Sequence, residues 1–184
     1  MDDDTVTGWA LAAQRGDRDA AAAFIRATTP PLRRLMTYLA DAGEADDLVQ
    51  ETYLRAFAAL PRYAQRSPAR LWLWSIARHV AADQIRQNQR SPRTSAGDWV
   101  YEMDSRHAES APAGLVELRV AISALDPDRR EAFVLTRVVG LSYEEAAVVC
   151  DCPVGTVRSR VFRARTDLLA FLDADHGPAT RVGP

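Results

Sequence analysis

Apolar side chains recur at the spacing of an α-helix with one buried face along most of this chain. Alternating runs rich in Val, Ile and Thr, which would indicate strands, are almost absent. The helical spacing stops over 91–114, where Ser, Gly, Pro and Ala are frequent. The pattern therefore predicts an all-α protein with two small helical domains, at 8–90 and 115–172, joined by a flexible linker. We expect the acidic N-terminal residues and the tail at 173–184 to be disordered.

The segment 142–168 predicts two helices joined by a tight turn. Ser142 and Glu145 have the spacing of a capping box that opens the first helix, and the second begins near Pro153. The second helix gathers apolar residues on one stripe: Val154, Val157, Val161, Ala164 and Leu168. Its opposite face carries Arg158, Ser159, Phe162 and Arg163. Because a solvated face has no use for an exposed aromatic ring, we interpret the pair as a helix-turn-helix whose second helix enters a DNA major groove.

A second informative helix is predicted over 46–60. Its apolar side centres on Val49, Tyr53, Ala56 and Leu60. Its outer face carries Asp47, Glu51, Leu54 and Arg55. The acidic residues at the start also favour the positive end of the helix dipole, which by itself could explain Asp46 and Asp47. Leu54 beside Glu51 on the outside favours a surface that docks another protein.

The segment 61–86 predicts a basic loop followed by a helix. The loop, 61–70, combines arginines with a tyrosine, a serine and prolines. The core side of the helix is expected to hold Leu73, Ile76, Ala77 and Val80, with Trp74, Arg78, Ala82 and Arg86 on the opposite side. Basic residues interleaved with aromatic ones suit unpaired nucleic acid, because its bases stack on the rings. We expect Trp72 to pack in the core and Trp74 to face outward for stacking or docking.

Charge is unevenly spread, although the formal net charge is only −2. The linker region is acidic: Asp98, Glu102, Asp104, Glu109 and Glu117 stand against the single Arg106 in 96–118. No apolar run approaches the roughly 18 residues of a membrane span. The N-terminal segment is acidic and lacks the basic and hydrophobic regions of a signal peptide. We therefore expect a cytoplasmic protein.

Catalytic and metal-binding patterns are missing from the sequence. The histidines His79, His107 and His176 are scattered, and neither a glycine-rich phosphate loop nor a nucleophile motif appears. We therefore expect no enzymatic activity and no cofactor. Cys150 and Cys152 have no second cysteine pair, so a zinc site is not predicted; Cys150 suits a small core position, and a redox role stays open. The output domain of a response regulator would explain 119–172, but the N-terminal half lacks the strands of a receiver domain.

Three motifs together resemble a known family. LSYEEAA followed by CPVGTVRSRVFRAR resembles conserved region 4 of the extracytoplasmic function (group IV) sigma factors, the promoter-recognition subunits of bacterial RNA polymerase. DDLVQETYLRAF resembles region 2.2, and SPARLWLWSIARHVAADQIR resembles regions 2.3 and 2.4. The resemblance runs from about residue 9 to 172 in the right order, and the actinobacterial sigma-C-like members look most similar. Region 2 would then occupy 8–90 and region 4 would occupy 115–172.

The resemblance implies three contact surfaces. Docking on the clamp helices of the polymerase largest subunit falls on Asp47, Gln50, Glu51, Leu54 and Arg55. Capture of the melted minus-10 element falls on Arg62, Tyr63, Ser67 and Arg70 in the loop and on Arg78, His79, Asp83 and Arg86 in the helix. Reading of the double-stranded minus-35 element falls on Arg158, Ser159, Phe162 and Arg163. Many members carry asparagine at the place of His79, so the minus-10 sequence preference does not transfer.

The resemblance also implies partners. They are core RNA polymerase, through the clamp helices and the flap, and promoter DNA, which is double-stranded at minus-35 and single-stranded at minus-10. The acidic linker would thread through the polymerase cleft and the RNA exit channel. An anti-sigma factor that masks these faces is common in the family, although no residue of this sequence indicates one.

Overall fold

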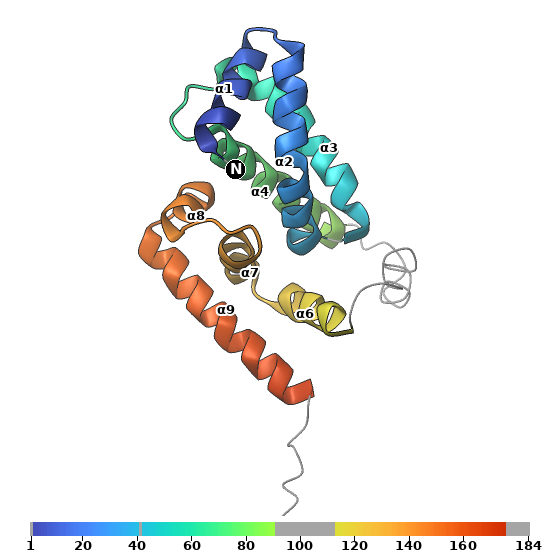
Figure 1. Cartoon of the computed structure of the whole chain (residues 1–184). Helices are drawn as coiled ribbons and strands as arrows, with labels where there is room; N and C mark the ends of the chain where they lie inside the picture. The colour runs from blue at the N-terminus through green and yellow to red at the C-terminus, as the bar shows by residue number, and fades with distance from the viewer. Residues whose placement is uncertain (1, 41, 91–112, 176–184) are drawn as a thin grey trace, which may run out of the picture.

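The structure is a computed structural model that describes residues 2–40, 42–90 and 113–175. Every regular element within these ranges is a helix, which confirms the all-α prediction (Figure 1). The N-terminal half contains α1 (Asp3–Gln14), α2 (Arg18–Leu39), η1 (Ala42–Glu44), α3 (Ala45–Ala59), η2 (Leu60–Arg62) and α4 (Ala69–Arg90). The C-terminal half contains α6 (Ala113–Ala124), α7 (Pro127–Phe133), the π-helical turn η4 (Val134–Val138), α8 (Tyr143–Cys150) and α9 (Val154–Asp175).

The expectation of a disordered acidic N-terminus is wrong for the described residues from Asp2 onward. Asp2 caps α1, because its carboxylate accepts a hydrogen bond from the backbone N–H of Thr5 at 3.0 Å. Val6 and Ala10 are fully buried against the rest of the N-terminal half. The aspartates that suggested a solvated tail therefore serve the start of a packed helix.

The predicted domain boundaries overlap the described ranges only in part. The predicted linker at 91–114 lies outside the described residues up to 112, and α6 begins at Ala113, slightly before the expected boundary. At the other end, α9 continues to Asp175, past the expected end at 172. The remainder of the predicted tail, 176–184, lies outside the described residues.

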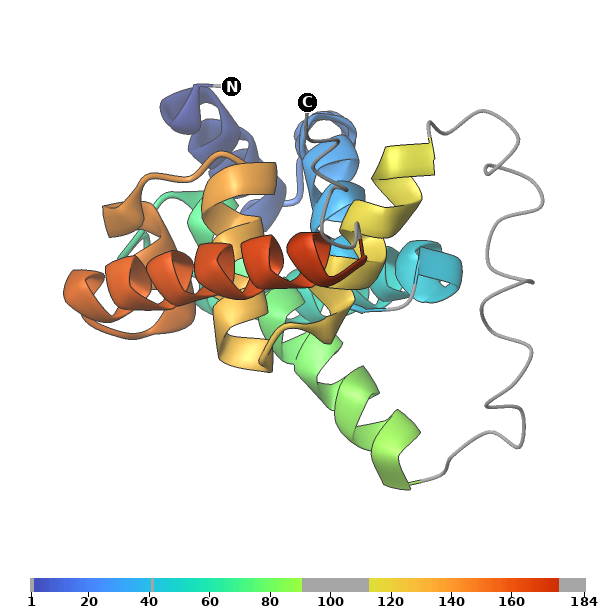
Figure 2. The same ribbon diagram turned by 90° about the horizontal axis from the view of Figure 1, so that it is seen from below.

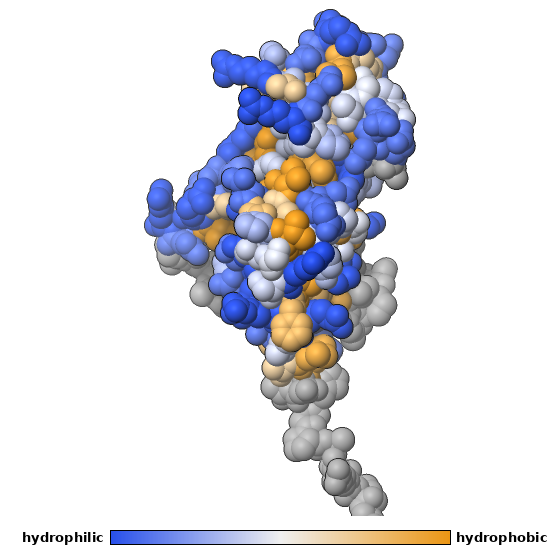
Figure 3. Space-filling view, turned by 90° about the vertical axis from the view of Figure 1, so that its left-hand side faces the viewer, coloured by the Kyte–Doolittle hydropathy of each residue, from blue (hydrophilic) through white to orange (hydrophobic). Residues whose placement is uncertain are grey.

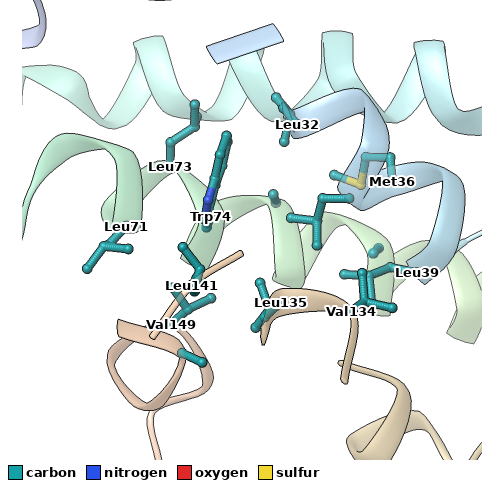
Figure 4. Close-up of a cluster of buried hydrophobic side chains, with 14 of the residues drawn as sticks. Leu32, Met36, Leu39, Leu71, Leu73, Trp74, Val134, Leu135, Leu141 and Val149 are labelled. Carbon is teal, nitrogen blue, oxygen red and sulfur yellow. The ribbon is translucent and has the colours of Figure 1, made fainter. Parts of the chain in front are cut away.

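The two halves pack directly against each other. α4 contacts α8, and α2 contacts both η4 and α6. In the views of Figures 1 and 2, α8 and η4 lie against the N-terminal bundle, while the C-terminal turns of α4 project beyond it. A close-up shows the shared core: Leu32, Met36 and Leu39 of α2 and Leu71, Leu73 and Trp74 of α4 face Val134, Leu135, Leu141 and Val149 of the second half (Figure 4).

The predicted helix-turn-helix is confirmed in α8 and α9. Ser142 accepts a hydrogen bond from the N–H of Glu145 at 3.0 Å, and the Glu145 carboxylate accepts one from the N–H of Ser142 at 2.7 Å. This reciprocal capping box fixes the start of α8. Asp151 closes the helix in the left-handed conformation, with φ of 50°, and turns the chain toward α9. This turn therefore fixes where α9 begins, and one long face of α9 stays exposed to solvent.

Candidate nucleic-acid and polymerase interfaces

The outer face of α9 is open to solvent, as its sequence pattern predicts. Val157, Val161 and Ala164 are buried to 1% exposure or less. Arg158, Ser159, Phe162 and Arg163 are exposed, and Phe162 is 72% exposed. Figure 3 looks onto the side of the molecule where α8 and the start of α9 lie, and apolar patches there run between charged side chains. An exposed phenylalanine between arginines forms a surface that can contact both the apolar parts and the phosphates of DNA.

Arg158 has local partners that leave it available. Its guanidinium lies 3.5 Å from the carboxylate of Glu144 and 5.8 Å from the centre of the Tyr143 ring. Both side chains of the Arg158–Glu144 pair are more than 60% exposed. Exposed pairs of this kind contribute little free energy, so the guanidinium can exchange the carboxylate for a base or a phosphate.

The outer face of α3 also matches its prediction. Leu54 is 68% exposed, and Asp47, Gln50 and Arg55 are exposed beside it, with Glu51 partly covered. Tyr53 points inward instead, and its hydroxyl lies 2.7 Å from the hydroxyl of Thr28 in α2. α3 therefore presents a mixed surface of one leucine and several charges, which is typical of a protein-docking site.

Arg55 links α3 to α4 through charge. It donates to Glu51 at 2.7 Å and to Asp83 of α4 at 2.6 Å, and Arg86 also pairs with Asp83. The hydrogen bond from Arg55, helped by Arg86, holds the pKa of Asp83 below its ordinary value. Residues that the sequence assigns to docking and to minus-10 contact thus form one network across two helices. Sequence spacing alone does not reveal this link, because Arg55 and Asp83 lie far apart along the chain.

The basic loop differs in two ways from its prediction. Arg70 lies in the first turn of α4 and not in the loop, because α4 begins at Ala69. Tyr63 is 6% exposed: its hydroxyl donates to the carbonyl of Ser67 at 2.6 Å, and its ring lies 4.9 Å from the Trp72 ring. The buried Tyr63 side chain therefore supports the loop from inside, and its ring is not free to stack on a base. Arg62 stays exposed.

On α4, the expectations for the two tryptophans have opposite outcomes. Trp72 packs on Tyr63, which agrees with the prediction of a packing role. Trp74 is 0% exposed, so the prediction of an outward-facing stacking residue is wrong. The reason is that its ring lies in the core that the two halves share, beside Leu32 and Leu73 of the N-terminal half and near Leu141 of the C-terminal half (Figure 4). His79 and Arg86 remain exposed.

Carboxylates cover two of the candidate minus-10 arginines. Arg70 is paired at 2.6 Å with Asp3 of α1 and at 2.6 Å with Glu145 of α8, and its side chain is 15% exposed. Arg78 is paired with Glu131 of α7, which is 7% exposed. Burial raises the pKa of Glu131, and the neighbouring Arg78 opposes that shift. The sequence pattern did not predict these three carboxylates as partners, because residues so far apart along the chain share no local periodicity.

Cys150 occupies the small core position that its sequence predicts. It is 4% exposed, and burial raises the pKa of its thiol to about 12. Cys152 is partly exposed. Within the described ranges, no group of three or more His, Cys, Asp or Glu side chains is arranged to hold a metal ion. No helix there is long and apolar enough to cross a membrane.

Comparisons with known proteins assign these surfaces to a family. The family model "Sigma-70 region 2" matches residues 24–91, and "Sigma-70, region 4" matches residues 115–168. The "Probable RNA polymerase sigma-C factor" of Mycobacterium bovis is 51% identical over 177 residues, which covers 95% of both chains. The chain belongs to the extracytoplasmic function sigma factors. As a member of that family, this sigma factor binds core RNA polymerase and directs it to promoters.

Other relatives and solved structures agree. The sigma factor is 39% identical over 152 residues to the "ECF RNA polymerase sigma factor EcfG" of Rhodopseudomonas palustris, covering 82% of this chain and 84% of that one. CnrH, solved with the cytosolic domain of CnrY, is similar with a TM-score of 0.73 and 28% identity, over 93% of this chain and 99% of CnrH. RpoE of Bartonella quintana, solved with the anti-sigma factor NepR, gives a TM-score of 0.67 and 34% identity, over 82% and 95% of the two chains. The region 2 match at 24–91 excludes the response-regulator alternative.

Proposed function

We propose that the sigma factor reads the minus-35 element with Arg158, Ser159, Phe162 and Arg163 on α9. The observation that carries this assignment is the outer face of α9, where Phe162 is 72% exposed. Arginine can bond guanine in a bidentate manner, which discriminates bases by about 1–3 kcal/mol for each good contact. The remaining polar groups of the face would hold the phosphates and set the position of the helix in the groove.

The α3 face is the proposed dock for the clamp helices of the polymerase. Its residues are Asp47, Gln50, Glu51, Leu54 and Arg55. Leu54 would be the apolar anchor, because it is 68% exposed within a ring of charges. Such an anchor gains binding energy when a partner covers it, whereas the surrounding charges select the partner and steer its approach.

The minus-10 element is proposed to contact the loop before α4 and the outer side of α4. The residues are Arg62, Tyr63, Ser67, Arg70, Arg78, His79, Asp83 and Arg86. Arg62, His79 and Arg86 are exposed for direct contact. Tyr63 and Ser67 would act by holding the loop in shape, since the Tyr63 hydroxyl donates to the Ser67 carbonyl at 2.6 Å. Arg70 and Arg78 would have to exchange their carboxylate partners for phosphates.

The domain assignment completes the proposal, with region 2 at 8–90, an acidic linker at 91–114 and region 4 at 115–172. Each region alone has a small basic surface, so polymerase would supply affinity by fixing both at the separation of the two promoter elements. The factor would act in the cytoplasm without catalytic activity. An anti-sigma partner is proposed because the similar RpoE structure is a complex with NepR.

Two variants test the surfaces separately in a holoenzyme assembled from core polymerase. Leu54→Glu should abolish co-purification with core polymerase, whereas Arg18→Glu, at an exposed site on α2, should not. The double variant Arg158→Ala, Arg163→Ala should keep co-purification and lose the minus-35 footprint on promoter DNA. Normal co-purification of Leu54→Glu would contradict the docking assignment, and an intact footprint with the double variant would contradict the minus-35 assignment.

A further inference from the structure

The helix α1 holds the loop that precedes α4 at both of its ends. Gln14, the last residue of α1, donates from its side-chain amide to the carbonyls of Leu60 and Tyr63, at 2.8 and 3.1 Å. These carbonyls lie at η2, where the loop begins. The Thr7 hydroxyl accepts a hydrogen bond from the N–H of Ala69 at 3.1 Å, where α4 begins. Two side chains of one helix therefore fix how far apart the ends of the loop lie (Figure 1).

The loop itself is irregular and contains a disfavoured backbone conformation. Residues 63–68 form no regular element, and the tip at 64–66 is exposed. Within this tip Gln65 has a φ of 54°, in the left-handed region that residues other than glycine seldom adopt. Such a conformation persists only where surrounding contacts hold it in place. The hydrogen bonds from α1 supply contacts of that kind on both sides of the tip.

Two further contacts connect α1 to the same region. Burial raises the pKa of Tyr63 inside the loop, and a hydrogen bond with the Thr7 side chain opposes that rise. Asp3 pairs with Arg70, directly after the loop, through both carboxylate oxygens at 2.6 and 3.0 Å. A pair with two hydrogen bonds fixes the direction of a guanidinium as well as its position. α1 thus contacts the start of the loop, its buried aromatic side chain and the residues that follow it.

We propose that α1 is a brace for the minus-10 loop, in which Thr7 and Gln14 are positioning residues that set the shape of the loop for the capture of unpaired bases. This inference rests on the minus-10 role proposed above for the loop. Both residues are partly buried and direct their polar groups at the protein, so they act through the loop and not by touching DNA. α1 also lies outside the two segments that the family models match, 24–91 and 115–168.

The shape of the loop matters because base capture competes with the DNA duplex. A base that leaves the duplex loses its pairing and stacking, so the loop must provide contacts that compensate for this loss. A loop with free ends would have to become ordered in the same step, and that cost would weaken capture. Holding the ends before DNA arrives removes the cost. The docking face on α3 and the outer face of α9 do not include the loop, so the brace should act on promoter melting alone.

The test compares four single substitutions in a holoenzyme assembled from core polymerase. Thr7→Val keeps the shape of the side chain and removes the hydroxyl, whereas Thr7→Ser keeps the hydroxyl. Gln14→Met keeps the length of the side chain and removes the amide donor. The matched control is Thr5→Val on the same helix: Thr5 is exposed, and its hydroxyl donates to Asp2 at 2.6 Å without contacting the loop.

Melting is measured as permanganate reactivity of minus-10 thymines, on a natural promoter and on one with a substituted minus-10 element. We expect Thr7→Val and Gln14→Met to lower reactivity on the natural promoter severalfold relative to the wild type and Thr5→Val, and Thr7→Ser to restore it. The preference for the natural promoter should also fall, because a loop of variable shape discriminates bases less well. Polymerase affinity and the minus-35 footprint should stay unchanged.

Three results would overturn the brace: melting by Thr7→Val and Gln14→Met equal to that of Thr5→Val, no rescue by Thr7→Ser, or an equal loss of polymerase affinity. Arg62→Ala separates these results from a failure of the proposed function, since Arg62 is exposed for direct contact with DNA. If Arg62→Ala lowers melting and the two α1 variants do not, the minus-10 role of the loop stands and the brace falls. If none of the three lowers melting, the minus-10 role itself fails, and the brace falls with it.

Discussion

At the scale of single residues, two aromatic side chains show what a sequence can and cannot predict. Phe162 faces outward as expected, because the apolar stripe that orients it lies on its own helix. Trp74 was expected to be equally open and is fully buried. Its neighbours Leu32 and Leu141 come from other elements, so the periodicity of α4 holds no signal of them (Figure 4). The positions of Arg158, Leu54 and their neighbours were predictable for the same local reason that applies to Phe162.

The two cysteines give a prediction at this scale. Burial raises the pKa of Cys150 to about 12, so its thiol stays protonated below that pH and almost no thiolate is present at pH 8. Iodoacetamide at pH 8 should therefore label Cys152, which is partly exposed, and should modify Cys150 only after denaturation. Peptide mass spectrometry measures both sites. Equal labelling rates in the folded protein would contradict the burial of Cys150.

At the scale of elements, the helix-turn-helix followed from chemistry that lies within a few residues. The spacing of Ser142 and Glu145 predicts a capping box, and the structure contains both of its hydrogen bonds. The start of α4 could not be predicted in this way. The N–H of its first residue, Ala69, donates a hydrogen bond to the hydroxyl of Thr7 in α1, which lies far away in the sequence. The prediction of a disordered N-terminus failed at α1, because Asp2 caps this helix and Asp3 pairs with Arg70. Ends that are capped locally can be predicted, and ends that are capped by another element cannot.

Ser142→Ala tests the local cap. The substitution removes the acceptor for the N–H of Glu145 and should lower the free energy of unfolding by about 1 kcal/mol, within a range of roughly 0.5–2 kcal/mol. Urea denaturation followed by circular dichroism measures the change. Ser123→Ala in α6 is the control, because that exposed hydroxyl only donates to a carbonyl in its own helix, and it should change stability by less than about 0.5 kcal/mol. Equal losses in both variants would contradict a special role of the cap.

At the scale of the whole molecule, the two predicted domains are present. The sequence pattern did not predict that they pack against each other. The interface depends on pairs such as Arg78 with Glu131, which only the folded chain brings together. The same interface holds the carboxylates that pair with Arg70 and Arg78. Trp74 and Arg70, which the local pattern predicts at the surface, are therefore largely covered in the folded chain.

The buried Glu131 makes the stability of the fold depend on pH. Burial raises its pKa above the ordinary 4.5, with Asp128 adding to the rise and Arg78 and Arg160 opposing it. A carboxyl with a raised pKa in the folded chain binds its proton more tightly there, so its contribution to the free energy of unfolding is fully present near pH 4.5 and is lost as pH rises through the raised value. Urea denaturation at a series of pH values measures this contribution. Glu131→Gln should flatten the dependence, and an unchanged profile would contradict the assignment to Glu131.

The most direct test of the account is run-off transcription by core RNA polymerase that lacks any other sigma factor. The purified protein is added with genomic promoter fragments, beside the Arg158→Ala, Arg163→Ala variant and an Arg15→Ala, Arg18→Ala control at exposed sites far from α9. We expect promoter-specific transcripts with the wild type and the control and at least tenfold fewer with the α9 variant, which corresponds to about 1.4 kcal/mol of lost binding. Specific DNA binding by the protein alone, without any transcript when polymerase is supplied, would contradict a sigma factor that reads minus-35 through α9.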